Sequence, residues 1–359
     1  MGKIKIAVLF GGRSPEHSIS CISANSILSA LDRNKYEVTP IGITMKNEWV
    51  VFKDKSPFLD LVKADLPEVK AEGISQNKSL SSGLITPPEL LTTDVVFPIL
   101  HGPNGEDGTI QGLFELLNLK YVGSGVLSSS VCMDKTVTKA LLSQGNLPIG
   151  DYLTISNHDW LANKSRITSA IKNMSFPLFI KPARSGSSLG ISKVKDFSNV
   201  EAAIEKAREF DKKVIVEASI ENSREIECGV LGGYKNFSVR ASLPAEIIVK
   251  SEHEFYDFEA KYIDDSVDLV VPANLSKALL TQVQDLSIKV FELLNCAGLA
   301  RIDFFITKNN EVIINEVNTM PGFTSISMFP RMWQSSGVNY ADLVDYLVEE
   351  ALNRVVETN

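Results

Sequence analysis

The first 120 residues alternate between short apolar runs and helical stripes, and this alternation limits the fold more than any other feature. The run at 4–10 is apolar and leads into Gly11-Gly12, which is typical of a buried parallel strand. Apolar residues then recur with helical spacing from Ala24 to Leu31, and strand-like runs follow at 38–43 and 94–100. Alternating strands and helices predict an open α/β sheet.

The rest of the chain reads as two α+β segments. The first opens with Asp134, which is placed to cap a helix, and contains a hairpin pattern in PLFIKPARSGSSLGISKV. The second is rich in strands and ends in an apolar helical stripe that starts at Tyr340. We therefore expect three domains, at 1–130, 131–216 and 217–359. The polar stretches at 53–90 and 251–266 predict a surface excursion and a loop.

Composition and charge exclude several classes of protein. With 36 Lys plus Arg against 44 Asp plus Glu, the 359-residue chain carries a net charge of −8, which argues against nucleic-acid binding. No apolar run approaches the ~20 residues of a membrane span, and the start does not resemble a signal peptide, so we expect a cytoplasmic protein away from membranes. The four cysteines lack a CxxC spacing and predict buried free thiols.

The strongest chemical signal is the hairpin LARIDFFITKNNEVIINEVN, with Asn309-Asn310 at its turn. Side chains alternate between the faces of a strand, so Arg301 and Asp303 share a face, as do Glu316 and Asn318. Two carboxylates and an amide oxygen are hard ligands that suit Mg²⁺. The alternative is a salt bridge or an exposed sheet face.

Three turns rich in glycine or small residues are further candidate sites. Lys181 precedes the loop SGSSLG, whose small residues let backbone N–H groups approach phosphate oxygens, although most such loops are plain turns. The turns GGRSPEHSIS and HGPNGEDGTIQG follow strands, where open α/β sheets bind ligands. The chain has no Walker A sequence and no GxGxxG, so these two nucleotide-binding motifs are absent.

Together these motifs resemble the D-alanine–D-alanine ligases of the ATP-grasp fold. The resemblance covers nearly the whole chain in order, through LFGGRSPEHSIS, FPILHGPNGEDGTIQG, MDK, FIKPARSGSSLGISKV, FYDFEAKY, LARIDFF and INEVNTMPGFTSISMFP. It implies an N-terminal open α/β domain followed by two α+β domains that enclose an ATP site. It also implies a ligase that joins two D-alanines through an acylphosphate intermediate, for peptidoglycan precursor synthesis.

The resemblance assigns roles at the nucleotide end of the site. Two Mg²⁺ or Mn²⁺ ions that bridge the phosphates would be held by Asp303, Glu316 and Asn318. The phosphates would meet Lys135, Lys181 and Lys261. Adenine would lie against the hinge backbone at Glu217, Ala218 and Ile220, and Glu225 would bind the ribose, with Glu227 as a nearby competitor.

The resemblance also assigns roles at the amino-acid end. Glu16 would hold the ammonium group of the first D-alanine and connect through Ser187 to Tyr262, while His101 would lie near the same substrate. Arg301 and the Gly322 backbone would form the oxyanion hole, and Ser327 would bind the carboxylate of the second D-alanine. The family implies a homodimer.

Two other functions stay open from the sequence. One is a ligase on the same fold that makes D-alanyl-D-lactate or D-alanyl-D-serine, although relatives that make D-lactate esters often alter the EAKY segment, which is intact here. The other is a non-catalytic sensor of small molecules. A sensor is expected to lose Asp303, Glu316 or Lys181, and all three are present.

Overall fold

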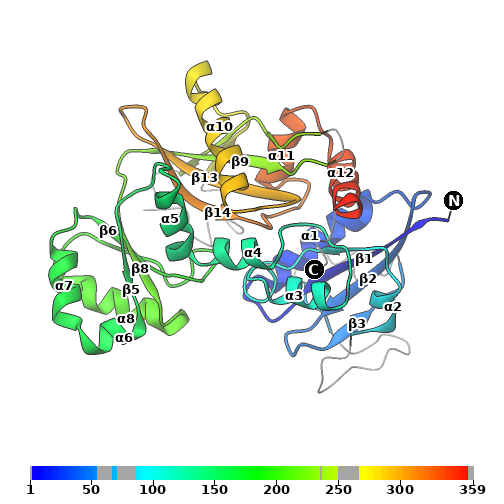
Figure 1. The fold of residues 1–359 in the computed structure, drawn as a ribbon, viewed down its shortest axis with the longest axis horizontal. Coiled ribbons are helices and arrows are strands. Elements are labelled where there is room, and N and C mark those ends of the chain that lie inside the picture. Colours follow the sequence, from blue (N-terminus) through cyan, green and yellow to red (C-terminus); the bar gives the residue numbers. More distant parts are fainter. Residues whose placement is uncertain (1, 55–66, 71–85, 235–236, 250–266, 355–359) are drawn as a thin grey trace.

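The computed structural model describes residues 2–54, 67–70, 86–234, 237–249 and 267–354, and its ribbon is shown in Figure 1. Three sheets succeed one another along the chain, with helices packed on each. The predicted mixture of α/β and α+β architecture is confirmed. Strand β8 continues to Ala218, two residues past the expected boundary at 216, and the three domain boundaries stay a prediction.

The N-terminal sheet has the strand order β3-β2-β1-β4. Its apolar strand β1 pairs in parallel with β2 and with β4, as the alternation predicted, and β3 adds an antiparallel edge. The surface excursion predicted at 53–90 is wrong at Val69, which is buried and packs against Gly42. The elements are β1 (Ile4–Gly11), α1 (His17–Ala30), β2 (Tyr36–Ile43), β3 (Trp49–Val51), α2 (Pro88–Leu91), β4 (Val95–Pro98), α3 (Thr109–Leu116) and α4 (Val126–Met133).

The central sheet is antiparallel, in the order β5-β8-β6-β7. Strands β6 and β7 form the predicted hairpin that carries Lys181 and the Gly/Ser loop. Helix α5 precedes this sheet, and Asp134 accepts the N–H groups of Thr136 and Val137 at its start, which confirms the predicted cap. The elements are α5 (Lys135–Gln144), β5 (Tyr152–Ile155), α6 (Asn157–Ala162), α7 (Lys164–Lys172), β6 (Leu178–Pro182), β7 (Ser192–Val194), α8 (Val200–Phe210) and β8 (Val214–Ala218).

The C-terminal sheet runs β12-β11-β9-β13-β14, with β10 beside β9. Its apolar face packs under α10 through residues such as Ile302 and Val290. The other face of β13 and β14 carries the polar side chains. The elements are β9 (Arg224–Leu231), β10 (Arg240–Ala241), β11 (Ala245–Val249), β12 (Val267–Val270), α10 (Lys277–Leu293), β13 (Leu299–Ile306), β14 (Val312–Asn318), α11 (Met328–Ser335) and α12 (Tyr340–Asn353).

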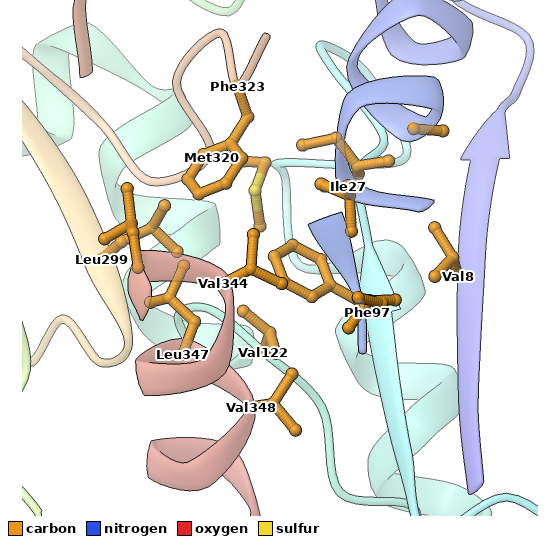
Figure 2. Packing of buried hydrophobic residues seen from close by; sticks show 14 of the residues in the cluster. Val8, Ile27, Phe97, Val122, Leu299, Met320, Phe323, Val344, Leu347 and Val348 are labelled. Carbon is orange, nitrogen blue, oxygen red and sulfur yellow. The ribbon is translucent and has the colours of Figure 1, made fainter. Parts of the chain in front are cut away.

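The last helix, α12, packs against the N-terminal sheet. Val344, Leu347 and Val348 of α12 belong to the same buried cluster as Val8 and Phe97 of the N-terminal sheet, and Figure 2 shows these side chains together. Fully burying a side chain of this size contributes roughly 1.5–3 kcal/mol. The helix therefore fixes the N-terminal sheet beside the C-terminal one. No helix within the described residues is long and apolar enough to cross a membrane.

The cysteines are free thiols among the described residues. Cys21, Cys132 and Cys228 are buried as predicted, whereas Cys296 is half-buried because it lies in the turn between α10 and β13.

Candidate active site

One cavity of about 870 Å³ collects the predicted site residues. It is lined by the polar face of β13 and β14, by the ends of β6 and β8, and by the turns before α1 and after β4. Every predicted site residue that the structure describes lines this cavity. Lys261 and Tyr262, together with the predicted loop around them, lie outside the described residues.

The hairpin places its four polar side chains on one face, as predicted. Arg301 lies opposite Asn318, and Asp303 lies opposite Glu316. The Arg301 guanidinium donates to both oxygens of Asp303 at 2.7 and 2.8 Å, and the Asn318 amide donates to Asp303 at 3.0 Å. Arg301 also lies 3.3 Å from a carboxylate oxygen of Glu227. Burial opposes its charge, but attraction to Asp303 prevails and raises the pKa of Arg301.

A register irregularity in this hairpin decides which side chains reach the cavity. The pairing shifts between Asp303 and Phe304, so that Asn315 is an extra residue in β14. Strict alternation from Val312 would place Glu316 on the buried face with Ile314. The shift instead places Glu316 on the cavity side.

The donor set of the hairpin suits a hard divalent cation. Asp303 and Glu316 supply carboxylate oxygens and Asn318 an amide oxygen, which are the ligand types that Mg²⁺ takes. Within the described residues no group of three or more His, Cys, Asp or Glu side chains could hold a metal ion. The third donor here is an amide, and Arg301 shares Asp303. The ligand types of Asp303, Glu316 and Asn318 therefore fit a divalent cation such as Mg²⁺. The positive charge of Arg301 would lie next to that cation.

The two predicted phosphate lysines are placed differently. Lys135 donates to the Ser185 carbonyl at 2.8 Å, and its ammonium lies 3.8 Å from Glu316, beside the predicted metal ligands. Lys181 forms an ion pair of 2.7 Å with Glu217 at the hinge. Burial lowers the pKa of Lys181, but attraction to Glu217 outweighs it and the pKa is raised. The negative charge of Glu316 on the hairpin adds to this rise in the pKa of Lys181.

Neighbouring carboxylates on β9 are separated by the sheet register. Glu225 lies opposite Phe305, toward the hinge end of the cavity. Glu227 is buried opposite Asp303 and faces Arg301. The geometry thus favours Glu225 over Glu227 for a ligand that extends from the hinge, and it places Glu227 with the arginine.

The amino-acid end of the cavity is organised around Glu16. Ser187, from the Gly/Ser loop, donates a hydrogen bond to Glu16, so the loop of the central sheet reaches the N-terminal segment. Gly102 and Gly186 approach the same carboxylate closely: a Cβ atom built on either would lie 2.6 and 2.9 Å from its Oε2. Neither position can therefore carry a side chain without displacing Glu16.

A buried histidine and a second acid complete this end. His101 contacts the Met320 carbonyl and the Ser23 hydroxyl, each at 3.1 Å, and burial lowers its pKa. Glu106 accepts the Gly102 N–H at 2.7 Å. Burial and the nearby negative charge of Glu16 raise the pKa of Glu106 to about 8. No sequence pattern predicts a role for Glu106, although it stands in the turn HGPNGEDGTIQG.

The segment after β14 supplies the remaining predicted groups. Ser327 immediately precedes α11, and its hydroxyl contacts the backbone N–H and the hydroxyl of Thr324 at 3.1 and 2.7 Å. Gly322 lies beside it, since a Cβ on Gly322 would be 3.3 Å from the Ser327 oxygen. N–H groups at a helix start attract anions, which suits this end of the cavity to a carboxylate.

Comparison with known families agrees with this geometry. Residues 5–124 match the model described as D-ala D-ala ligase N-terminus, and residues 141–349 match D-ala D-ala ligase C-terminus. The chain belongs to the D-alanine–D-alanine ligase family. A family member from Arthrobacter sp. (strain FB24) is 46% identical over 98% of this chain and 95% of its own length. One from Caldicellulosiruptor bescii is 45% identical over 99% and 96%.

Solved structures of the ligase family share the fold. The D-alanine–D-alanine ligase of Coxiella burnetii is 37% identical with a TM-score of 0.79, over 99% of this chain and 95% of that one. The VanG D-Ala:D-Ser ligase of Enterococcus faecalis is 36% identical with a TM-score of 0.80, over 98% and 100%. The predicted ATP-grasp fold and ligase family are confirmed. Both acceptor types thus occur among the structural relatives.

Proposed function

We propose that the chain uses ATP to join two D-alanines into D-alanyl-D-alanine. The carboxylate of the first D-alanine attacks the γ-phosphate, which yields an acylphosphate and ADP. The amine of the second D-alanine then attacks the acyl carbon, and inorganic phosphate leaves. The observation that carries this proposal is the convergence of all fifteen described site residues of the family pattern on one cavity.

The nucleotide end supports phosphoryl transfer, which needs positioning and charge neutralisation more than covalent catalysis. Asp303, Glu316 and Asn318 would hold two Mg²⁺ or Mn²⁺ ions, which would neutralise charge on the phosphates. Lys135, whose ammonium lies 3.8 Å from Glu316, would bind a phosphate oxygen. Glu217 and the backbone through Ala218 and Ile220 would hold adenine, with Glu225 at the ribose.

The amino-acid end supports the acyl-transfer step. Glu16 would bind the ammonium group of the first D-alanine, with His101 beside it. Arg301 and the Gly322 N–H would stabilise the oxyanion of the tetrahedral intermediate. Ser327, at the start of α11, would bind the carboxylate of the second D-alanine.

Closure of the cavity protects an acylphosphate from water. The hydrogen bond from Ser187 to Glu16 already joins the Gly/Ser loop to the N-terminal segment. We propose that Tyr262 extends this link and that Lys261 reaches the phosphates, as the family pattern implies. In the cell the reaction would supply peptidoglycan precursors from the cytoplasm, with the enzyme as a homodimer.

Purified enzyme tests the proposal directly. ADP release is measured with ATP, Mg²⁺ and each of D-alanine, D-serine and D-lactate as acceptor beside D-alanine, and the products are identified by mass spectrometry. We expect D-alanyl-D-alanine as the main product. A main product that contains D-serine would favour the activity named for the Enterococcus faecalis relative. Absence of ADP with every acceptor would refute a ligase and favour a sensor.

A further inference from the structure

A buried ion cluster borders the hinge end of the cavity. It contains Lys139, which has no part in the reaction proposed above. Lys139 of α5 lies 2.8 Å from Oε1 of Glu217, and Lys181 of β6 lies 2.7 Å from Oε2 of the same carboxylate. The side chains of Lys139 and Glu217 are only 4% and 10% exposed. Both lysines and Glu217 line the cavity. One carboxylate is thus held from two sides by two elements.

The cluster keeps Glu217 charged. Burial alone would raise the pKa of Glu217, but attraction to Lys181 and Lys139 lowers it to about 2. A carboxylate offers about four acceptor positions, and the two lysines occupy one on each oxygen. Glu217 can therefore accept a further hydrogen bond from a group in the cavity, and it cannot donate one.

Lys139 is itself held in place. Its ammonium lies 6.0 Å from the ring centre of Tyr152, within reach of a cation–π contact. Tyr152 begins β5 and pairs with Glu217 in the ladder between β5 and β8. The lysine therefore joins α5 to both strands at the point where Glu217 faces the cavity.

The two purine bases differ at the edge that such an acceptor would meet. Adenine presents an N6 amino group, which donates, whereas guanine presents a carbonyl O6, which accepts. A fixed carboxylate favours the amino group and repels the carbonyl oxygen. A lysine beside the carboxylate can donate a hydrogen bond to N7 of the base. Both purines carry N7, so this contact does not distinguish them.

We propose that Lys139 is a positioning residue that fixes the Glu217 carboxylate, so that the nucleotide site takes adenine in preference to guanine. The inference rests on the proposed function, because it assumes that the hinge end holds the base. Lys139 acts through Glu217 and touches neither the phosphates nor the amino acids. Its loss should therefore change nucleotide affinity and base choice while it leaves the affinity for D-alanine unchanged.

The test is Lys139→Met, which keeps most of the side-chain volume and removes the charge. We expect KM for ATP to rise about tenfold, equivalent to about 1.4 kcal/mol, with kcat and KM for D-alanine nearly unchanged. The preference for ATP over GTP should fall by a similar factor. Lys139→Arg, which keeps the charge and a donor, should retain more of this preference than Lys139→Met.

Lys164→Met is the control for loss of a paired lysine outside the cavity. Lys164 also pairs with one carboxylate, Glu201, and lies over one aromatic ring, Trp160, but it does not line the cavity. This variant should keep the wild-type nucleotide constants. Calorimetric binding of ADP and GDP in the absence of D-alanine repeats the comparison independently of ligation, so failure of the proposed function would leave this test intact.

Two results would overturn the proposal. One is a Lys139→Met protein with wild-type KM for ATP and wild-type base preference. The other is an equal rise in the KM values for ATP and D-alanine with a lower melting temperature, because that pattern indicates a purely structural lysine. If Lys139→Met does not fold, Lys139→Gln is measured in its place under the same two criteria.

Discussion

Ionisation of the Glu106 side chain should change the free energy of unfolding of the protein. The pKa of Glu106 is raised to about 8 by burial and by the negative charge of Glu16, so the carboxyl is mostly neutral at pH 7. Glu106→Gln replaces the neutral acid with a group of almost the same shape that cannot ionise. We expect the variant to fold, and to differ from wild type chiefly in its response to alkaline pH.

The size and sign of the effect follow from proton linkage. The pKa of Glu106 is about 8 in the folded state and 4.5 in its ordinary, unfolded environment. Between pH 4.5 and pH 8 the folded state therefore binds more protons than the unfolded state does. The stability that this gives is complete below pH 4.5 and is lost as pH rises through the folded pKa. Integrated from pH 7 to pH 9, a pKa of about 8 costs wild type about 1.4 kcal/mol of unfolding free energy. Glu106→Gln should not show this loss.

The assay is urea unfolding at pH 6 to 9.5 for wild type, Glu106→Gln and the control Glu89→Gln, which removes an exposed acid from α2. Wild type and the control should lose stability together above pH 7, and Glu106→Gln should lose about 1.4 kcal/mol less. Parallel curves for wild type and Glu106→Gln would refute the buried, neutral acid.

Three further predictions concern the proposed reaction. Glu316→Gln should fold but lower turnover about a hundredfold or more, because an amide cannot neutralise phosphate-bound cations as a carboxylate does; full activity at ordinary Mg²⁺ would contradict the metal assignment. Lys181→Ala should raise KM for ATP at least about tenfold, since it removes a buried charge that is paired with Glu217 in the cavity. An unchanged ATP titration would make Lys181 purely structural. Tyr262→Phe should raise ester formation with D-lactate relative to peptide formation by about tenfold; identical product ratios from pH 6 to 9 would exclude Tyr262 as a determinant of acceptor choice.

Local patterns in the sequence were sufficient for many elements and for the composition of the site. The alternation at 4–43 predicted β1, α1 and β2, and Asp134 predicted the start of α5, because periodicity and capping depend on neighbouring residues. Alternation singled out the polar residues of the hairpin, and the family resemblance supplied most of the other candidate site residues. The cavity then brought together those that the structure describes.

Sequence reasoning missed features that depend on contacts between distant segments. Val69 is buried because it packs against Gly42 of the N-terminal sheet, although its neighbours Glu68 and Lys70 are polar. Lys139 stands in an amphipathic helix, where a lysine is normally exposed. Only the approach of β8 to α5 gives it Glu217 as a partner.

For the β13–β14 hairpin, the sequence by itself determined the two strands, the turn at Asn309-Asn310 and the identity of the polar residues. Alternation and turn chemistry are local properties, so neighbouring residues are enough to predict them. The tertiary structure decided which of those residues face the cavity. The extra residue Asn315 shifts the register, so that Glu316 leaves the buried face while Val317 enters it under α10. Such a shift is set by pairing with β13 and by packing of the helix, and neither contact is encoded in the spacing of β14 alone.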